Sequence, residues 1–272
     1  MVASPESPIQ VAILLGGLGT RLGHRTARIP KGLIPVRGRP FLAHQLDMMA
    51  GHGVRDVVLC VGHRADQIER YVGDGRAWSL RVQYSHDGPH LLGTAGALRR
   101  ALPLLAPDFV VSYGDSYVAL DYPDLLRAHA DAGPAATVAV YQNAGRWDRS
   151  NIVLERDRVA VYDKYRDHPG MTWIDAGVTA LRRSWVAGLP GTLPLDLAEQ
   201  FHALAAAGGM GAYRTDERFY EVGSPGGLAE FRRVVAARDR VARVGVSRGR
   251  GAAAASHPTV SAPSRHAAGA PA

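Results

Sequence analysis

Two lysines stand out in this sequence because arginine supplies nearly all of its positive charge. Lys31 and Lys164 are the only lysines among 32 basic residues. A lysine ammonium is a compact, mobile point charge, whereas an arginine guanidinium is a planar fork with fixed donor directions. Lysines kept in such a background suggest sites that need a mobile charge. Two ordinary surface lysines would look the same until their neighbours are considered.

A glycine-rich stretch precedes the first of these lysines. An apolar run over residues 9–15 leads into Gly16-Gly17-Leu18-Gly19-Thr20-Arg21, and Pro30-Lys31 follows after a short polar stretch. Glycines at the carboxyl end of a strand let backbone amides approach a phosphate closely. Leu22 stands where a dinucleotide fingerprint needs its third glycine, and the Gly-Lys-Ser/Thr ending of a Walker A loop is missing. The spacing therefore predicts a phosphate site of another kind.

The segments between the motifs predict the elements that position them. Short apolar runs alternate with helical patterns up to residue 141, which indicates a mostly parallel, Rossmann-like α/β sheet sandwiched by helices. Beyond residue 141, successive strands joined by turns favour a small antiparallel addition. The predicted strands cover residues 9–15, 56–61, 80–84, 109–113, 137–141, 151–155, 158–163 and 173–181, with a last pair near residue 213 and at 219–222. The predicted helices cover residues 40–50, 66–72, 94–105, 122–132, 195–207 and 225 to about 240.

Charge divides the chain into a neutral body and a basic end. The 272 residues are 46% apolar, which suffices for one substantial domain. The 41 residues from Arg232 onward hold eight arginines and one acid, so they carry a net charge equal to the +7 of the whole chain. The body therefore gives no sign of a basic nucleic-acid-binding face. We expect a flexible N-terminus (1–8), a folded catalytic domain (9–242) and a disordered Ala/Ser/Pro-rich basic tail (243–272).

The single cysteine and the apolar runs bear on the compartment. Cys60 lies in a predicted buried strand and has no intrachain partner for a disulfide, which fits a reducing compartment. Residues 1–8 lack a basic leader segment, and no apolar stretch approaches the length that spans a bilayer. We expect a cytoplasmic protein without membrane or nucleic-acid partners.

Ordered motifs over about residues 9 to 240 resemble those of the sugar-1-phosphate nucleotidyltransferases. The glycine-rich loop with Ile29-Pro30-Lys31 is similar to the signature loop of that family. Six further segments match in family order: 36–42 (VRGRPFL), 92–98 (LGTAGAL), 113–115 (YGD, at the family's metal-binding GD), 163–164 (DK, at its EK), 174–177 (IDAG) and 220–225 (YEVGSP).

The resemblance implies an enzyme that grips phosphates. Arg21 and Lys31 would hold the triphosphate from two sides, Lys164 would hold the attacking sugar phosphate, and Asp115 would complete the catalytic set. Such a transfer needs charge neutralisation and in-line positioning more than covalent help. The implied nucleotide-binding residues are Leu15, Gly16, Gly17, Gly19, Thr20, Arg21, Lys31, Gly93, Thr94 and Gly114.

Asp115 and Glu221 are the implied metal ligands. Mg²⁺ is commonly held by one or two carboxylates, with phosphate oxygens and waters completing the octahedron. Asp115 follows a predicted strand at the edge where open parallel sheets bind ligands, although a turn or helix-capping aspartate is the structural alternative. Glu221 stands where the family typically has aspartate. Its longer arm leaves both direct and water-mediated coordination open.

The implied sugar-phosphate site departs from the family in its acidic residues. Asp163 replaces the usual glutamate before the lysine, and Asp175 stands where asparagine is frequent, which keeps an acceptor but removes an amide donor. The predicted antiparallel addition would carry this site. Its implied residues are Asn151, Asp163, Lys164, Asp175 and Gly177.

The favoured substrates are GTP and a heptose or mannose 1-phosphate. The short chain with LGTAGAL and YDK most resembles the guanylyltransferases for D-glycero-D-manno-heptose 1-phosphate or mannose 1-phosphate. Thymidylyl, uridylyl or cytidylyl transfer to another hexose 1-phosphate stays open. An NAD-dependent oxidoreductase is disfavoured because the third glycine and an acidic ribose ligand are missing. A non-catalytic nucleotide-sugar sensor would be expected to lose Arg21, Lys31 or Asp115, which are all present, and only Glu221 supports it.

Overall fold

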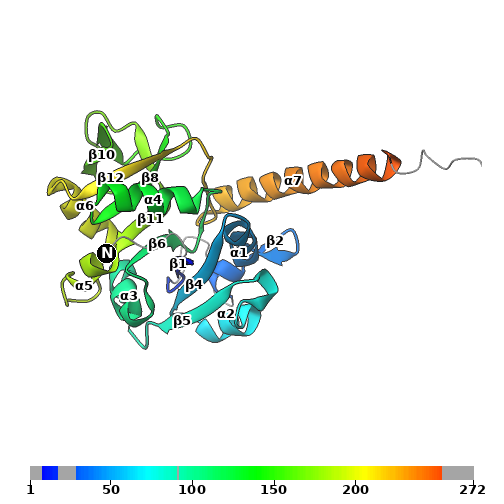
Figure 1. The fold of residues 1–272 in the computed structure, drawn as a ribbon, viewed down its shortest axis with the longest axis horizontal. Coiled ribbons are helices and arrows are strands. Elements are labelled where there is room, and N and C mark those ends of the chain that lie inside the picture. The colour runs from blue at the N-terminus through cyan, green and yellow to red at the C-terminus, as the bar shows by residue number, and fades with distance from the viewer. Residues whose placement is uncertain (1–7, 18–28, 91, 253–272) are drawn as a thin grey trace, which may run out of the picture. The chain divides into compact units, whose positions relative to one another are not determined.

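A computed structural model describes residues 8–17, 29–90 and 92–252 of the chain. Nine strands form its main sheet: β1 (Ile9–Leu14), β4 (Val54–Val61), β5 (Arg81–His86), β6 (Asp108–Tyr113), β8 (Ala136–Gln142), β9 (Ile152–Glu155), β10 (Arg158–Tyr162), β11 (Trp173–Arg182) and β12 (Met210–Thr215). Their order across the sheet is β5-β4-β1-β6-β11-β8-β12-β10-β9 (Figure 1). The first four are parallel, and the expected Rossmann-like α/β fold is confirmed.

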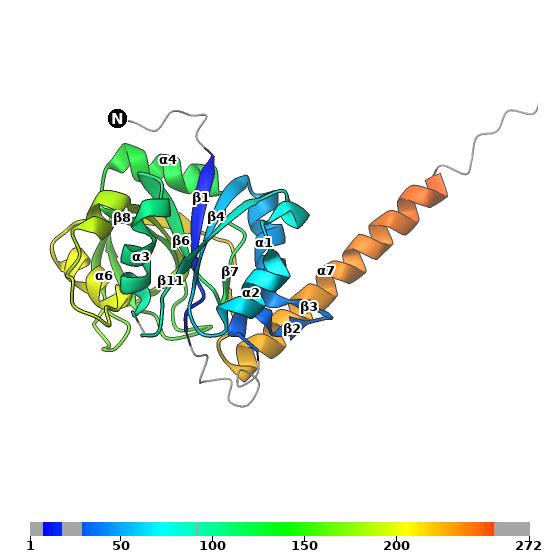
Figure 2. The same cartoon turned by 90° about the horizontal axis from the view of Figure 1, so that it is seen from below.

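The helices cover both faces of this sheet (Figure 2). They are α1 (Phe41–Gly51), α2 (Ala65–Val72), α3 (Thr94–Ala101), α4 (Tyr122–Ala132), α5 (Arg183–Ala187) and α6 (Leu197–Ala206). The last helix of the chain is α7 (Pro225–Ala252). On one face, α3, α5 and α6 pack over a core that includes Ala12, Leu98 and Phe201. Helices α1 and α4 contact the sheet as well. Residues 11–13 of β1 are buried regardless of which face they point to, as expected for a strand covered on both sides.

Two short ribbons lie outside the main sheet. β2 (Pro35–Val36) pairs with β3 (Arg39–Pro40), and β7 (Ser116–Tyr117) pairs antiparallel with β13 (Tyr220–Glu221). Short 3₁₀ helices occupy Lys31–Leu33, Arg76–Trp78 and Leu102–Leu104. The β7–β13 ribbon matters for function because it joins segments that are more than a hundred residues apart in sequence.

The sheet differs from the sequence-based expectation in two places. Strand β11 lies inside the sheet, antiparallel to both β6 and β8, and does not form part of a separate addition. The expected pairing of the last two strands is wrong, because β12 runs parallel to β8 and β13 pairs with β7. Local patterns predict that a segment is extended, but long-range contacts determine which strand it pairs with.

Helix ends also differ from the expectation, for local reasons. The predicted helix over residues 94–105 is α3 followed by the 3₁₀ helix Leu102–Leu104, because Pro103 cannot donate a backbone hydrogen bond. Helix α6 begins after Asp196, whose carboxylate accepts a hydrogen bond from Ala198 N at 2.7 Å.

The chain forms two compact units, residues 1–232 and 233–272. As far as it is described, the second unit is the remainder of α7, which extends past the expected end near residue 240 to Ala252. The proposed boundaries at residues 8 and 242 stay predictions. None of the described helices is both long enough and apolar enough to cross a membrane.

Candidate active site

Lys31, Asp115 and Glu221 converge at one point of the structure. Lys31 begins the 3₁₀ helix that follows Pro30, Asp115 occupies the tight turn between β6 and β7, and Glu221 ends β13. The ribbon register pairs Glu221 with Ser116, and the backbone N–H of Val222 donates to the Asp115 carbonyl at 2.9 Å. Lys31 Nζ forms an ion pair with Asp115 Oδ2. Three residues from distant parts of the sequence are thus brought together.

Gly223 lies at the centre of this cluster. A methyl group on its Cα would lie 2.5 Å from Glu221 Oε1, 2.9 Å from Asp115 Oδ2 and 2.9 Å from Lys31 Nζ. Alanine at this position would force these three side-chain ends to shift. The sequence contains Gly223 within the YEVGSP motif, but nothing in the motif shows that the glycine makes space for the cluster.

The donor set fits a magnesium ion that is shared with phosphate. Asp115 and Glu221 offer carboxylate oxygens, which are hard ligands suited to Mg²⁺. Within the described residues, no group of three or more His, Cys, Asp or Glu side chains is placed to hold a metal ion. Two carboxylates would therefore leave most coordination positions to phosphate oxygens and water, as is usual for Mg²⁺ at nucleotide sites.

Gln45 of α1 holds the turn that carries Asp115. Its Nε2 donates to the carbonyls of Tyr113 at 3.0 Å and Ser116 at 2.9 Å, one on each side of Asp115. The side chain is fully buried, and its Oε1 has no partner among the described residues. A polar residue on the apolar face of a helix is the one signal by which the sequence could have revealed it.

Only the first part of the glycine-rich loop is described. Leu15 N donates to the Cys60 carbonyl at 2.8 Å, which fixes the chain at the carboxyl end of β1. A methyl group on Gly17 would meet no atom of the described residues within 4 Å, so the described part of the fold does not demand glycine there. Gly114 packs against Leu14 and Leu15, which joins this loop to the Asp115 turn. Gly19, Thr20 and Arg21 lie outside the described residues.

Asp87 is an unforeseen acidic residue beside this loop. It follows β5, and its carboxylate contacts the backbone of Gly16 and Gly62 at the carboxyl ends of β1 and β4. Its Oδ1 is buried and accepts no hydrogen bond from the described residues. Burial raises the pKa of Asp87, while Arg100 and His86 oppose that shift. The sequence offers no pattern that separates it from a surface aspartate.

Gly93 and Thr94 have structural partners at the start of α3. Gly93 has φ +75°, and a methyl group there would lie 2.7 Å from Leu195 N. The Thr94 hydroxyl accepts a hydrogen bond from Leu197 N at 2.7 Å. These contacts tie α3 to the segment before α6. The nucleotide-binding role expected for both residues stays a prediction.

Lys164 lies in a buried polar centre next to the Asp115 turn. Its Nζ is 3.1 Å from Asp175 Oδ2 and 4.7 Å from the centre of the Tyr113 ring. Asp175 also accepts hydrogen bonds from Tyr162 Oη at 2.8 Å and Gly177 N at 2.7 Å. Gly177 has φ +84° and packs against Ser116, so this centre adjoins the β7 ribbon.

Electrostatics keeps this centre charged. Burial alone would lower the pKa of Lys164, but Asp175, Tyr113 and Tyr162 outweigh it and hold that pKa well above its ordinary value. Burial, together with Asp175 and other carboxylates, raises the pKa of Tyr113 to about 12 despite the opposing Lys164 ammonium. Lys164 is therefore a fixed cation at neutral pH, bound to a carboxylate.

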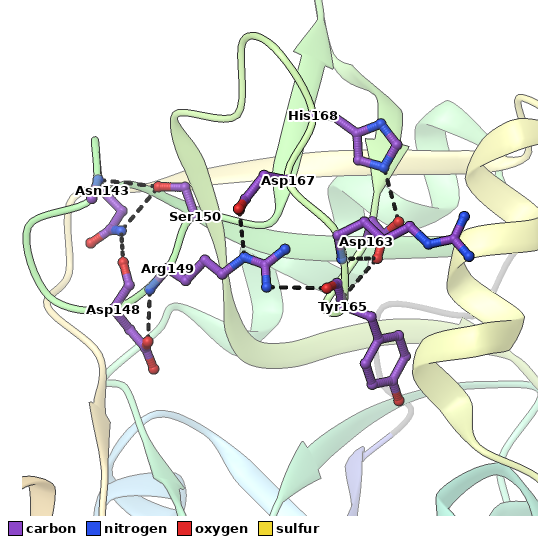
Figure 3. A network of polar contacts seen from close by, with 10 residues as sticks. Asn143, Asp148, Arg149, Ser150, Asp163, Tyr165, Asp167 and His168 are labelled. Atoms are coloured by element: carbon purple, nitrogen blue, oxygen red, sulfur yellow. Dashed lines mark hydrogen bonds and ion pairs between the residues drawn. The ribbon is translucent and has the colours of Figure 1, made fainter.

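Two further expected sugar-site residues frame Lys164. Asn151 Oδ1 accepts a hydrogen bond from Asp175 N at 3.0 Å, and the Asn151 carbonyl accepts one from Asp163 N at 2.9 Å. The Asp163 carboxylate is bonded to its own loop (Figure 3). The structure thus brings Asn151, Asp163, Lys164, Asp175 and Gly177 together, while their contact with a sugar phosphate stays a prediction.

Comparisons with known proteins agree with this arrangement. Residues 10–147 match the model of the nucleotidyl transferase family. CMP-5'-(3-aminopropyl)phosphonate synthase of Streptomyces rubellomurinus is 32% identical over 85% of this chain and 40% of its own length. Mannose-1-phosphate guanylyltransferase of Mycobacterium tuberculosis is 28% identical over 80% of this chain and 62% of its own length.

Solved structures show the same fold. HddC of Yersinia pseudotuberculosis superposes with a TM-score of 0.70 at 25% identity, covering 84% of this chain and 99% of that one. A second crystal structure of HddC contains GMP-PN. The chain spans 36 to 62% of the length of the curated relatives that it matches. This chain belongs to the nucleotidyl transferase family, and the predicted membership among the sugar-1-phosphate nucleotidyltransferases is confirmed.

Proposed function

We propose that this protein transfers a nucleotidyl group from a nucleoside triphosphate to a sugar 1-phosphate, giving a nucleotide-sugar and pyrophosphate. The convergence of Lys31, Asp115 and Glu221 around Gly223 carries this proposal. It places a cation and two carboxylates beside a glycine-rich loop at the carboxyl ends of parallel strands, where α/β proteins bind nucleotides. The family membership supports the same reaction class.

Each charged residue has a distinct part in the proposed reaction. Asp115 and Glu221 would hold Mg²⁺, which when bound neutralises charge on the triphosphate. Lys31 would exchange its ion pair with Asp115 for contact with the phosphates. Lys164 would hold the acceptor phosphate so that its oxygen lies in line with the α-phosphorus. Arg21 is expected to stabilise the leaving pyrophosphate.

Asp87 supports guanine as the base. A buried carboxylate oxygen that accepts no hydrogen bond from the described residues calls for an N–H group from the ligand. Guanine presents two adjacent donors, the ring N1–H and the 2-amino group, to one carboxylate. Uracil and thymine flank a single N–H with carbonyl oxygens, while adenine and cytosine place an acceptor nitrogen beside the amino group. An ionised Asp87 near the Gly16 backbone would therefore favour GTP.

A cytidylyl transfer to a phosphonate is the second candidate. The phosphonate synthase from Streptomyces is similar to this chain over a longer stretch, and at higher identity, than the guanylyltransferase from Mycobacterium. Asp175 adds a negative charge beside Lys164, where an acceptor that carries its own donors would be favoured. A phosphonate offers the same type of attacking oxygen as a sugar phosphate, so both candidates use the same site.

The test is pyrophosphate release with Mg²⁺, each common nucleoside triphosphate, and a panel of mannose, heptose and glucose 1-phosphates and 3-aminopropylphosphonate. The proposal expects release that needs both GTP and a sugar 1-phosphate. Asp115→Ala should reduce it by orders of magnitude, and near-normal turnover of that variant would contradict the metal assignment. Binding of a triphosphate without release for any pair would favour the sensor alternative.

The base assignment has its own test. Asp87→Asn should reduce the preference for GTP over UTP by about tenfold, because the amide loses one acceptor and turns a donor toward the base. Asp74→Asn, in an exposed turn before β5, is the matched control and should leave the preference unchanged. An unaltered preference in Asp87→Asn would remove Asp87 from the base site.

A further inference from the structure

The loop after β10 has an unusually well-bonded aspartate at its start. Asp163 Oδ1 accepts hydrogen bonds from the backbone N–H groups of Tyr165 at 2.8 Å and Arg166 at 2.9 Å (Figure 3). Its Oδ2 lies 2.9 Å from His168 Nε2. The carboxylate therefore closes a turn over residues 163–168 from within, as aspartates do when they cap backbone donors.

This bonding leaves the Asp163 carboxylate little capacity for a ligand. The side chain is only 6% exposed. Its contact with His168 and its bonds from the Tyr165 and Arg166 N–H groups lower its pKa, so the carboxylate is ionised at neutral pH. Three contacts occupy most of the roughly four acceptor positions of the carboxylate, which leaves little room for a sugar hydroxyl.

The loop between β8 and β9 contacts the turn over residues 163–168. Arg149, between β8 and β9, donates from Nη1 to the Tyr165 carbonyl at 3.2 Å and pairs through Nε with Asp167 at 2.6 Å (Figure 3). The loop that carries Arg149 is closed in turn by Asn143, whose Nδ2 donates to Ser150 Oγ at 3.0 Å. The β8–β9 loop and the β10–β11 loop are thus linked on the side of the site where the sugar phosphate is expected.

Lys164 stands between the two residues that this network fixes. Asp163 precedes it, Tyr165 follows it, and its own ammonium lies 3.1 Å from Asp175. The backbone of the lysine is thereby held independently of its charged end. We infer that Asp163 is a positioning residue that aims Lys164 at the acceptor phosphate and is not itself a ligand of the sugar.

The inference rests on the proposed function, because Lys164 must grip the acceptor. The experiment measures kcat/KM for the acceptor at saturating triphosphate in wild type, Asp163→Ala, Lys164→Ala and the double variant. Asp163→Ala is expected to lower this constant about tenfold, which is the scale of a lost hydrogen bond to a charged group. It should leave kcat/KM for the triphosphate within about twofold.

The double variant separates positioning from direct contact. If Asp163 acts through Lys164, Asp163→Ala should cost less than about twofold in the Lys164→Ala background. The loss should also be equal for mannose 1-phosphate and glucose 1-phosphate, because both present the same phosphate. A tenfold loss that persists without Lys164, or a loss that depends on the sugar, would show that Asp163 contacts the acceptor and would overturn the inference.

Two controls keep the outcome interpretable. Asp167→Ala removes an exposed ion pair from the same loop and should change the constant by less than about twofold. If Asp163→Ala does not fold, Asp163→Asn retains an acceptor for the backbone donors and should show a smaller loss with the same dependence on Lys164. Additive variants in an active wild type would refute the positioning role alone, whereas a wild type inactive with every substrate pair would refute the proposed function and this role with it.

Discussion

Substituting Gly223 by alanine perturbs the catalytic cluster without removing any charged group. Ordinary van der Waals contact begins near 3.4 Å, so the new methyl group would push Glu221 Oε1 away by about 0.9 Å and Asp115 Oδ2 and Lys31 Nζ by about 0.5 Å. These atoms are the ends of flexible side chains, which can move without the backbone. The cost in the free energy of unfolding should therefore stay near 1 kcal/mol, the lower end for overpacking.

The effect on turnover should be much larger. A displacement of about 1 Å in a phosphate-positioning group can cost about a hundredfold in rate, which corresponds to roughly 2.7 kcal/mol of transition-state stabilisation. The assay is pyrophosphate release as a function of Mg²⁺ concentration, alongside denaturant unfolding. Gly223→Ala should lower kcat and raise the Mg²⁺ concentration needed for half-maximal rate.

Gly226→Ala is the matched control for this variant. It adds the same methyl group three residues away, in the first turn of α7, where nothing lies within 4 Å outside neighbouring residues and the helix backbone. Helix propensity favours alanine there, so stability should not fall. If Gly223→Ala keeps turnover and Mg²⁺ dependence within about twofold of those of Gly226→Ala, the convergence of the three side chains has no bearing on catalysis.

Three other expectations follow from the same geometry. Gly17→Ala should leave the melting temperature unchanged, because its methyl group meets no atom of the described residues, yet raise the KM for the triphosphate about tenfold if a phosphate approaches that backbone; an unchanged KM would move the phosphates elsewhere. Gln45→Leu should destabilise the fold by about 1–3 kcal/mol by stranding two carbonyls and should also weaken Mg²⁺ activation, since Asp115 lies between them; lost stability with normal Mg²⁺ dependence would make Gln45 purely structural. The lowered pKa of Asp163 stabilises the fold above the ordinary carboxyl pKa, and this stabilisation is lost as pH falls through the folded-state pKa. The unfolding free energies of wild type and Asp163→Asn should thus converge in acid, and a pH-independent difference would contradict the assignment.

Local sequence patterns predicted the parallel half of the fold well. Strands β1, β4 and β6 contain apolar runs bounded by turns, and a strand buried on both faces leaves that pattern in any context. Strand β5, at the edge of the sheet, has only two buried residues, Val82 and Ser85. The placement of β11 inside the sheet depends instead on its pairing with β6 and β8. The same is true of β13, since two residues are too short to show any periodicity.

The residues of the candidate site likewise include some that local sequence patterns predict and others that depend on long-range contacts. Lys31 and Lys164 were predicted because they are the only lysines and lie in family motifs, and Asp115 because it follows a predicted strand in such a motif. Gly223 and Gln45 were not, because their importance lies in contacts with residues more than sixty positions away. A glycine that makes space for side chains looks like a turn glycine in the sequence, and a buried glutamine looks like a surface one.

Lys31 and Lys164 are held by different kinds of contact, and this difference constrains the proposed chemistry. Lys31 has one described ion-pair partner, Asp115, and its side chain is 18% exposed. It can exchange that carboxylate for a phosphate while Asp115 turns to a metal ion. Lys164 is paired with an Asp175 that also accepts hydrogen bonds from Tyr162 and Gly177.

Separating Lys164 from Asp175 would leave the Asp175 carboxylate, whose side chain is only 1% exposed, without its ion-pair partner, which costs far more than breaking an exposed pair. A substrate phosphate must therefore join the Lys164–Asp175 pair and cannot replace Asp175 in it. On the triphosphate side, Lys31 can therefore exchange its carboxylate partner for a phosphate. On the acceptor side, Lys164 and Asp175 stay paired in a fixed geometry. Hydroxyl or amino donors on the acceptor would then offset the negative charge of Asp175.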